Sequence, residues 1–152
     1  MILRVVLAAL LATALVAVSL PAAERASIES TETQMRATMS HFQTAIEMLP
    51  AQTDPVSPEQ SLTHHTITLR LPERTWTSAR ISHVIIEPTA TGGVLRWQVS
   101  DGQPHALFIE GVCVETPGHP EGIEIVEPGT HRLGLTLETR TETTVVTVRR
   151  LP

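Results

Sequence analysis

The sequence predicts an α+β fold: an N-terminal membrane helix and an amphipathic helix, followed by a mainly antiparallel, sandwich-like β domain of about seven strands. Three observations support this prediction. Val5–Leu20 carries no charge, residues 27–49 repeat apolar side chains at helical spacing, and the chain beyond residue 60 alternates apolar and polar side chains between turn sequences. We therefore expect a membrane anchor or signal segment over 1–23, an amphipathic helix over 24–49, a proline-rich linker over 50–60 and an extracytoplasmic β domain over 61–152.

The first segment is long enough to cross a membrane. At about 1.5 Å per residue, residues 2–23 span roughly 33 Å, against a hydrocarbon core of about 30 Å. Eleven of residues 2–20 are Leu, Ile or Val, and each favours insertion near the bilayer centre. Arg4 and the amino terminus form the positive side, so we expect a single-pass protein of the cell membrane with its C-terminal domain outside. The expected anchor residues are Val5, Leu7, Leu10, Leu11, Leu15, Val18 and Leu20.

A cleaved signal peptide is the alternative for this segment. The apolar stretch of such signals runs about 7–15 residues before small residues at the cleavage site, and Ala17-Val18-Ser19 has an acceptable small-x-small pattern. Cleavage near Ser19 or Ala23 predicts a secreted β-sandwich domain that binds a ligand. A lipid-anchored form is excluded, because the single cysteine, Cys113, lies far from this segment.

The stretch from Ser27 to Leu49 is typical of an amphipathic helix. Thr31 with Gln34 three residues later suggests a capping box, and Pro50 is expected to end the helix. The apolar residues follow a spacing of 7, 4, 3, 4 and 3, so they form one contact stripe that packs on the chain's own sheet or on a sister protein. Whether this helix continues unbroken from the anchor stays open at this point. The stripe consists of Ile28, Met35, Met39, Phe42, Ile46 and Leu49.

Seven strands are expected beyond the linker, because short alternating runs recur between Pro- and Gly-containing turns. The expected strands are 62–71, 80–87, 94–100, 105–110 with a possible continuation over 112–115, 122–127, 131–138 and 143–150. The expected inward-facing residues are Ile67, Leu69, Leu71, Ile81, Ile85, Leu95, Trp97, Val99, Ile123, Ile125, Leu133, Leu135, Leu137, Val146 and Val148.

Charge and composition exclude some functions. Residues 24–152 hold ten arginines, no lysine and sixteen carboxylates, for a formal charge of −6. Because non-specific nucleic-acid affinity comes from cations that neutralise phosphates, we expect no nucleic-acid partner. Threonine, with 21 copies that lie mostly beyond residue 60, suits pleated and half-buried strand surfaces.

Residues with catalytic or metal-binding chemistry are present, but they form no motif. The seven histidines include the adjacent His64 and His65, which point to opposite faces of a strand and cannot share a metal ion. Most histidines are therefore expected to be surface polar residues, and Cys113 a small buried residue between two valines. Trp97 alternates with core residues, whereas Trp76 is the aromatic residue expected to be exposed. We expect no catalytic residue, cofactor, metal or small-molecule substrate.

The order of the segments resembles that of type IV pilin-like subunits, in which an N-terminal helix anchors in the membrane and its second half packs on a β domain. No acidic residue lies in the first part of the apolar run, so we do not expect a polymerising pilin. Three stretches resemble a family of small, uncharacterised, membrane-anchored proteins of halophilic archaea: LRVVLAALLATALVAVSLPAAE, TITLRLPERTWTSA and EPGTHRLGLTLETRTETTVVTVRRL. The resemblance implies a membrane-associated accessory protein that works alongside pilus or secretion components.

Together these observations predict a non-enzymatic structural or accessory protein of a pilus- or secretion-type surface assembly. Its expected partners are the lipid bilayer and other membrane or surface-assembly proteins. The secreted ligand-binding β domain stays open as the alternative, and an enzyme that uses Cys113 or a histidine is the remaining class.

Overall fold

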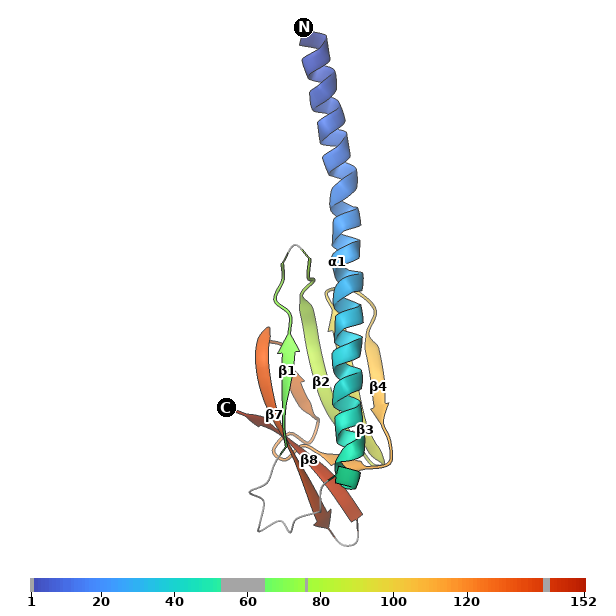
Figure 1. Cartoon of the computed structure of the whole chain (residues 1–152), viewed down its shortest axis with the longest axis vertical. Helices are drawn as coiled ribbons and strands as arrows, with labels where there is room; N and C mark the ends of the chain where they lie inside the picture. Colours follow the sequence, from blue (N-terminus) through green and yellow to red (C-terminus); the bar gives the residue numbers. More distant parts are fainter. Residues whose placement is uncertain (1, 53–64, 76, 141–142) are drawn as a thin grey trace.

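The computed structural model describes residues 2–52, 65–75, 77–140 and 143–152. Within these residues one long helix precedes eight strands, so the predicted α+β class is confirmed. Figure 1 shows the first half of the helix extending alone and the second half lying along the β domain. The elements are α1 (Ile2–Gln52), β1 (His65–Leu71), β2 (Ile81–Thr89), β3 (Gly92–Val99), β4 (His105–Ile109), β5 (Cys113–Glu115), β6 (Ile123–Ile125), β7 (Gly129–Arg140) and β8 (Thr143–Leu151).

The anchor segment and the amphipathic segment form one unbroken helix, which answers the question of their continuity. Pro21 lies within α1, where it removes one backbone donor without ending the helix. The predicted capping box at Thr31 and Gln34 is wrong, because helical residues precede Thr31 and its Oγ1 donates to the Ser27 carbonyl at 2.8 Å. Pro50 also lies inside the helix, which ends at Gln52; residues 53–60 of the predicted linker lie outside the described residues.

The strands form two four-stranded sheets, ordered β1-β7-β8-β5 and β4-β3-β2-β6. All their pairings are antiparallel except β5 with β8. The expected continuation of β4 over 112–115 is instead β5, a strand of the other sheet. Gly111 between them has a φ of 77°, a left-handed conformation that suits a sharp change of chain direction. The chain therefore crosses between the sheets at this point.

One hydrophobic core joins the helix and both sheets. α1 contacts β3 and β4 of one sheet and β1, β7 and β8 of the other. In Figure 1, β1 and β4 lie on opposite sides of the lower half of α1. Trp97 is 2% exposed, as predicted from its alternation with core residues. The second half of the helix is thus a structural layer of the β domain, and the first half extends beyond that domain.

The predicted inward position of Ile85 is wrong. Ile81 is buried, but a β-bulge between Ile81 and His83 shifts the register against β3. An extra residue in a strand reverses the faces of all the residues that follow it. Val84 and Ile86 therefore enter the core, while Ile85 is half-buried on the opposite face. Ile67, also predicted to face inward, is half-buried against the core.

Candidate anchor and helix–domain contact site

The first half of α1 exposes its apolar side chains. Every described residue from Ile2 to Ala26 is exposed. Removing apolar surface from water is favourable by about 25 cal/mol per Å². This exposed part of the helix is therefore more stable in an apolar environment than in water. Within the described part of the chain, α1 is the one helix long and apolar enough to cross a membrane. The predicted anchor residues Val5, Leu7, Leu10, Leu11, Leu15, Val18 and Leu20 all lie exposed on it.

The second half of α1 buries the predicted contact stripe in the protein's own core. Met35, Met39, Phe42, Ile46 and Leu49 are each at most 3% exposed. Ile28, the first residue of the stripe, is partly buried against the same core. Successive members lie seven, four, three, four and three residues apart, so they occupy one face of the helix and meet the sheets together.

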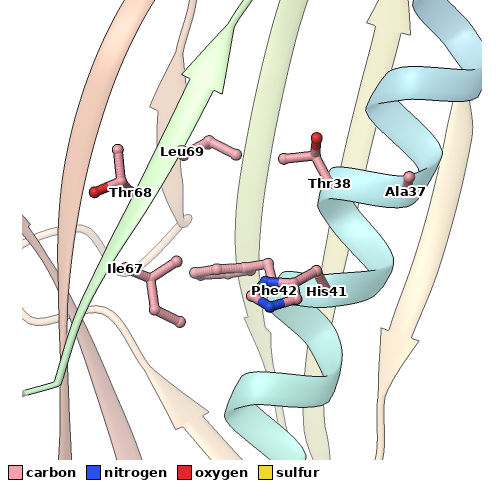
Figure 2. A pocket seen from close by; sticks show the side chains of 7 residues that line it. All are labelled: Ala37, Thr38, His41, Phe42, Ile67, Thr68 and Leu69. Atoms are coloured by element: carbon pink, nitrogen blue, oxygen red, sulfur yellow. The ribbon is translucent and has the colours of Figure 1, made fainter.

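A shallow groove of about 290 Å³ runs between α1 and β1 beside this stripe. Figure 2 shows the Phe42 ring pointing from the helix toward Ile67 on the strand, and the neighbouring His41 is exposed. His41 is the single titratable side chain of the lining, so the groove offers neither an acid–base pair nor a charged anchor for a ligand. The lining consists of Ala37, Thr38, His41, Phe42, Ile67, Thr68 and Leu69.

Thr31 marks the point where the helix joins the β domain. Thr31 is 1% exposed, and its hydroxyl accepts a hydrogen bond from the Ala79 backbone N–H at 2.8 Å. The same hydroxyl donates to the Ser27 carbonyl, so both of its hydrogen-bonding roles are filled. This bond ties the connector between β1 and β2 to a fixed height along α1.

The helix also covers the free edge of β4 with two polar side chains. Gln43 Nε2 donates to the Phe108 carbonyl at 2.8 Å, and Glu47 Oε1 accepts from the Glu110 backbone N–H at 3.3 Å. Gln43 also donates to Glu47 Oε1 at 2.9 Å. Unpaired edge groups otherwise form a template for another strand. In this region α1 therefore both packs against the sheet and covers the polar backbone groups at its edge.

His105 lies between the helix and β3, contrary to its expected position at the surface. Its ring stacks on Trp97 with 5.3 Å between the ring centroids. Its Nε2 lies 3.6 Å from Glu32 Oε1, and this buried atom has no hydrogen-bond partner within the described part of the chain. The imidazole therefore acts here as a flat packing surface at the helix–sheet contact, with one carboxylate nearby.

His131 is also buried, at 7% exposure, and it belongs to a polar cluster near the start of β7. Arg150 Nη2 lies 3.3 Å from His131 Nδ1 and 2.9 Å from Glu127 Oε2. Because a guanidinium only donates, Nδ1 must accept, and Nε2–H donates to the Glu127 carbonyl at 2.8 Å. The Arg150 hydrogen bond and charge lower the pKa of the Glu127 carboxyl below its ordinary value. Both ring nitrogens are thus used within the fold.

The remaining predicted chemistry residues do not gather into one site. His41, His65 and His119 are exposed, and His83 and Cys113 are half-buried. Cys113 is thus less buried than expected, because it lies on β5 at the edge of its sheet. Among the described residues, no three His, Cys, Asp or Glu side chains could hold a metal ion together. His64 and Trp76 lie outside the described residues.

Sequence reasoning missed His105, His131 and Arg150 as structural residues. Their partners are distant in the chain, so no local spacing indicates them. An indirect signal existed for His105, because it follows a turn sequence and precedes the alternating apolar residues Leu107 and Ile109.

Comparison with known proteins identifies a family. Searches of the curated proteins and of the solved structures found no match. A family profile matches residues 2–151, which covers the exposed helix, the buried helix and both sheets. The chain therefore belongs to the family described as Domain of unknown function (DUF7311).

Proposed function

We propose that this protein is a single-pass protein of the cell membrane. It holds a β domain close to the external surface of that membrane and works by contacting other macromolecules. The observation that carries the proposal is the division of α1. Its first 25 described residues expose apolar side chains to their surroundings, whereas its second half is part of the core. A rigid helix of this kind transmits the position of the anchor directly to the domain.

The proposed role is that of a non-enzymatic accessory protein in a pilus- or secretion-type surface assembly. The order of apolar helix, buried helix and β domain supports this role, because that order resembles pilin-like subunits. The proposal predicts co-purification with other components of such an assembly from detergent-solubilised membranes. Recovery of the full-length chain as a lone monomer would count against this role but not against the anchor.

Alkaline carbonate extraction of membranes tests the anchor. The wild-type chain is expected to stay with the membranes and to be released by detergent. Leu11→Arg, near the centre of the apolar run, is expected to move the chain toward the soluble fraction, since a central Arg costs about 2.5–3.5 kcal/mol of insertion. Leu11→Met is the matched control and should behave as wild type. Release of the wild-type chain by carbonate would refute the anchor.

A secreted ligand-binding β domain is the second candidate, and one observation favours it. The buried part of α1 begins with Ser27 and Ile28, which are half-buried, so cleavage near Ser19 or after Ala23 leaves the whole core intact. N-terminal sequencing of the mature protein distinguishes the two candidates. An N-terminus at residue 1 or 2 supports the anchored form, and one near residues 20–24 supports secretion.

A further inference from the structure

We propose that the tip of the β1–β2 connector, which we define as the described residues 73–75 and 77–78, lies in the lipid headgroup layer and binds headgroup phosphate through Arg74. The inference rests on the proposed membrane anchor and adds a second point of contact with the bilayer. It follows from the height at which the structure holds this connector along the helix.

The charged residues fix how α1 sits in the bilayer. No charge occurs between Arg4 and Glu24, and the nineteen residues between them span roughly 28 Å of helix, close to a hydrocarbon core of about 30 Å. Glu24 and Arg25 therefore lie where the hydrocarbon ends. The headgroup layer occupies about 5–7 Å beyond that level on each side of the bilayer.

The β domain begins only a short distance below this level. Ser27 is the first half-buried residue of α1, about 5 Å along the axis from Glu24. Thr31, which bonds to Ala79, lies roughly 10 Å from Glu24. A segment that rises more than about 3–5 Å above Ala79 therefore enters the headgroup layer, which extends about 5–7 Å from the level of Glu24.

The β1–β2 connector extends in that direction. Figure 1 shows the described residues of this connector rising beside α1, toward the N-terminus, beyond the ends of both strands. Thr77 is two residues from Ala79, and two extended residues span up to about 7 Å. The tip is closed by a hydrogen bond from the Thr75 N–H to the Ser78 carbonyl at 2.9 Å and by one from the Thr77 N–H to Thr75 Oγ1 at 3.3 Å. These two bonds hold Thr75 close to Thr77 and Ser78.

The side chains of the tip suit a phosphate-rich layer. Glu73, Arg74, Thr75 and Thr77 are exposed, and a guanidinium recognises phosphate with paired donors. One Arg and one Glu leave the tip without net charge, so long-range electrostatic attraction does not bring it to the membrane. The anchor and the Thr31–Ala79 hydrogen bond hold the tip at this height instead. The contact should therefore form with zwitterionic phosphatidylcholine as well as with anionic lipids. Together with the helix, it sets the rotation of the domain about the membrane normal.

Fluorescence quenching in nanodiscs tests the contact. The full-length chain, in a Cys113→Ser background, carries a fluorophore at Thr77→Cys on the tip or at Thr91→Cys in the exposed β2–β3 turn at the opposite end of the domain. The nanodiscs contain phosphatidylcholine with a fraction of lipid spin-labelled on its headgroup. We expect a loss of fluorescence at position 77 and none at position 91. Arg74→Gln should weaken the quenching at position 77, whereas Arg149→Gln, an exposed arginine on β8, should leave it unchanged.

The outcomes separate this inference from the proposed anchor. Failure of the chain to stay in nanodiscs refutes the anchor. Retention of the chain with equally weak quenching at positions 77 and 91 overturns the headgroup contact alone. If the Thr77→Cys variant fails to fold, Glu73→Cys places the label on the same tip and should show the same loss.

Discussion

The two halves of α1 share one unbroken backbone but differ in everything that surrounds them. Residues from Ile2 to Ala26 are exposed on all sides, whereas one face of the second half is buried among strands from both sheets. The apolar side chains are spread around the first half, whereas the buried apolar side chains of the second half form one stripe and Met48 is exposed outside it. Such an all-round pattern is typical of a membrane span, and a single stripe is typical of a helix that packs on a protein core. One helix is therefore suited to two different environments.

The largest expected effect comes from the same substitution made in each half. Leu49→Ala removes a side chain that is 3% exposed in the core, and such substitutions cost about 2–5 kcal/mol. Leu11→Ala changes an exposed residue of the first half and should leave the stability of the β domain unchanged. Denaturant unfolding of both variants in mild detergent, followed by circular dichroism, measures the difference. Equal destabilisation by the two variants would show that the halves do not have separate environments.

A smaller effect is expected at the junction between the halves. Thr31→Val keeps the shape of the side chain but leaves the Ala79 N–H without its acceptor, at a cost of about 1–3 kcal/mol. Thr33→Val is the matched control, because Thr33 is exposed and its hydroxyl donates within the helix, to the Glu29 carbonyl. Thermal unfolding of the two variants compares them. A Thr31→Val protein as stable as the control would mean that this bond does not fix the helix to the connector.

The cover over the β4 edge should contribute less. Gln43→Ala removes the bond to the Phe108 carbonyl, and a hydrogen bond of this kind contributes about 0.5–1.5 kcal/mol. Gln34→Ala, at an exposed helical position, controls for the change in helix propensity. Hydrogen exchange at the β4 amides is expected to speed up in the Gln43 variant alone. Equal exchange in both variants would show that the edge is protected without Gln43.

The smallest effect concerns acid stability, in a cluster away from the helix. Arg150 lowers the pKa of Glu127 from its ordinary value of 4.5, so this carboxylate stabilises the fold above about pH 4.5. That contribution is lost as the pH falls from the ordinary value through the lowered folded-state value. Arg150→Gln should therefore flatten the decline in melting temperature over this acidic range, and Arg149→Gln should not. An unchanged acid profile in the Arg150 variant would contradict the role of the pair.

Local patterns predicted most of the strands because alternation of side chains is a local property. The prediction failed where one extra residue changed the register. Counting by two from Ile81 leads to Ile85, but the bulge places Val84 and Ile86 in the core. A bulge is set by pairing with a neighbouring strand, so the spacing within one strand cannot reveal it.

Part of the candidate site could likewise be predicted from local sequence, and part of it could not. The contact stripe could be predicted from spacing within one helix, since its members lie seven, four, three, four and three residues apart. The partners that fix the helix could not. Thr31 and Ala79 are 48 residues apart, and Gln43 lies 65 residues from Phe108. Thr31 resembled a helix cap because a hydroxyl that accepts a backbone N–H has the same sequence signature in both roles.

Site-directed spin labelling along α1 tests the central division most directly. Single nitroxides at Leu11→Cys and Thr33→Cys, in the Cys113→Ser background and in liposomes, are compared for accessibility to oxygen and to a water-soluble nickel chelate. Because Leu11 and Thr33 are both exposed in the structure, the protein itself shields neither label. Lipid around the first half predicts high oxygen and low nickel accessibility at position 11, with the reverse at position 33. Equal nickel accessibility at both positions would contradict the division of this helix between bilayer and protein core.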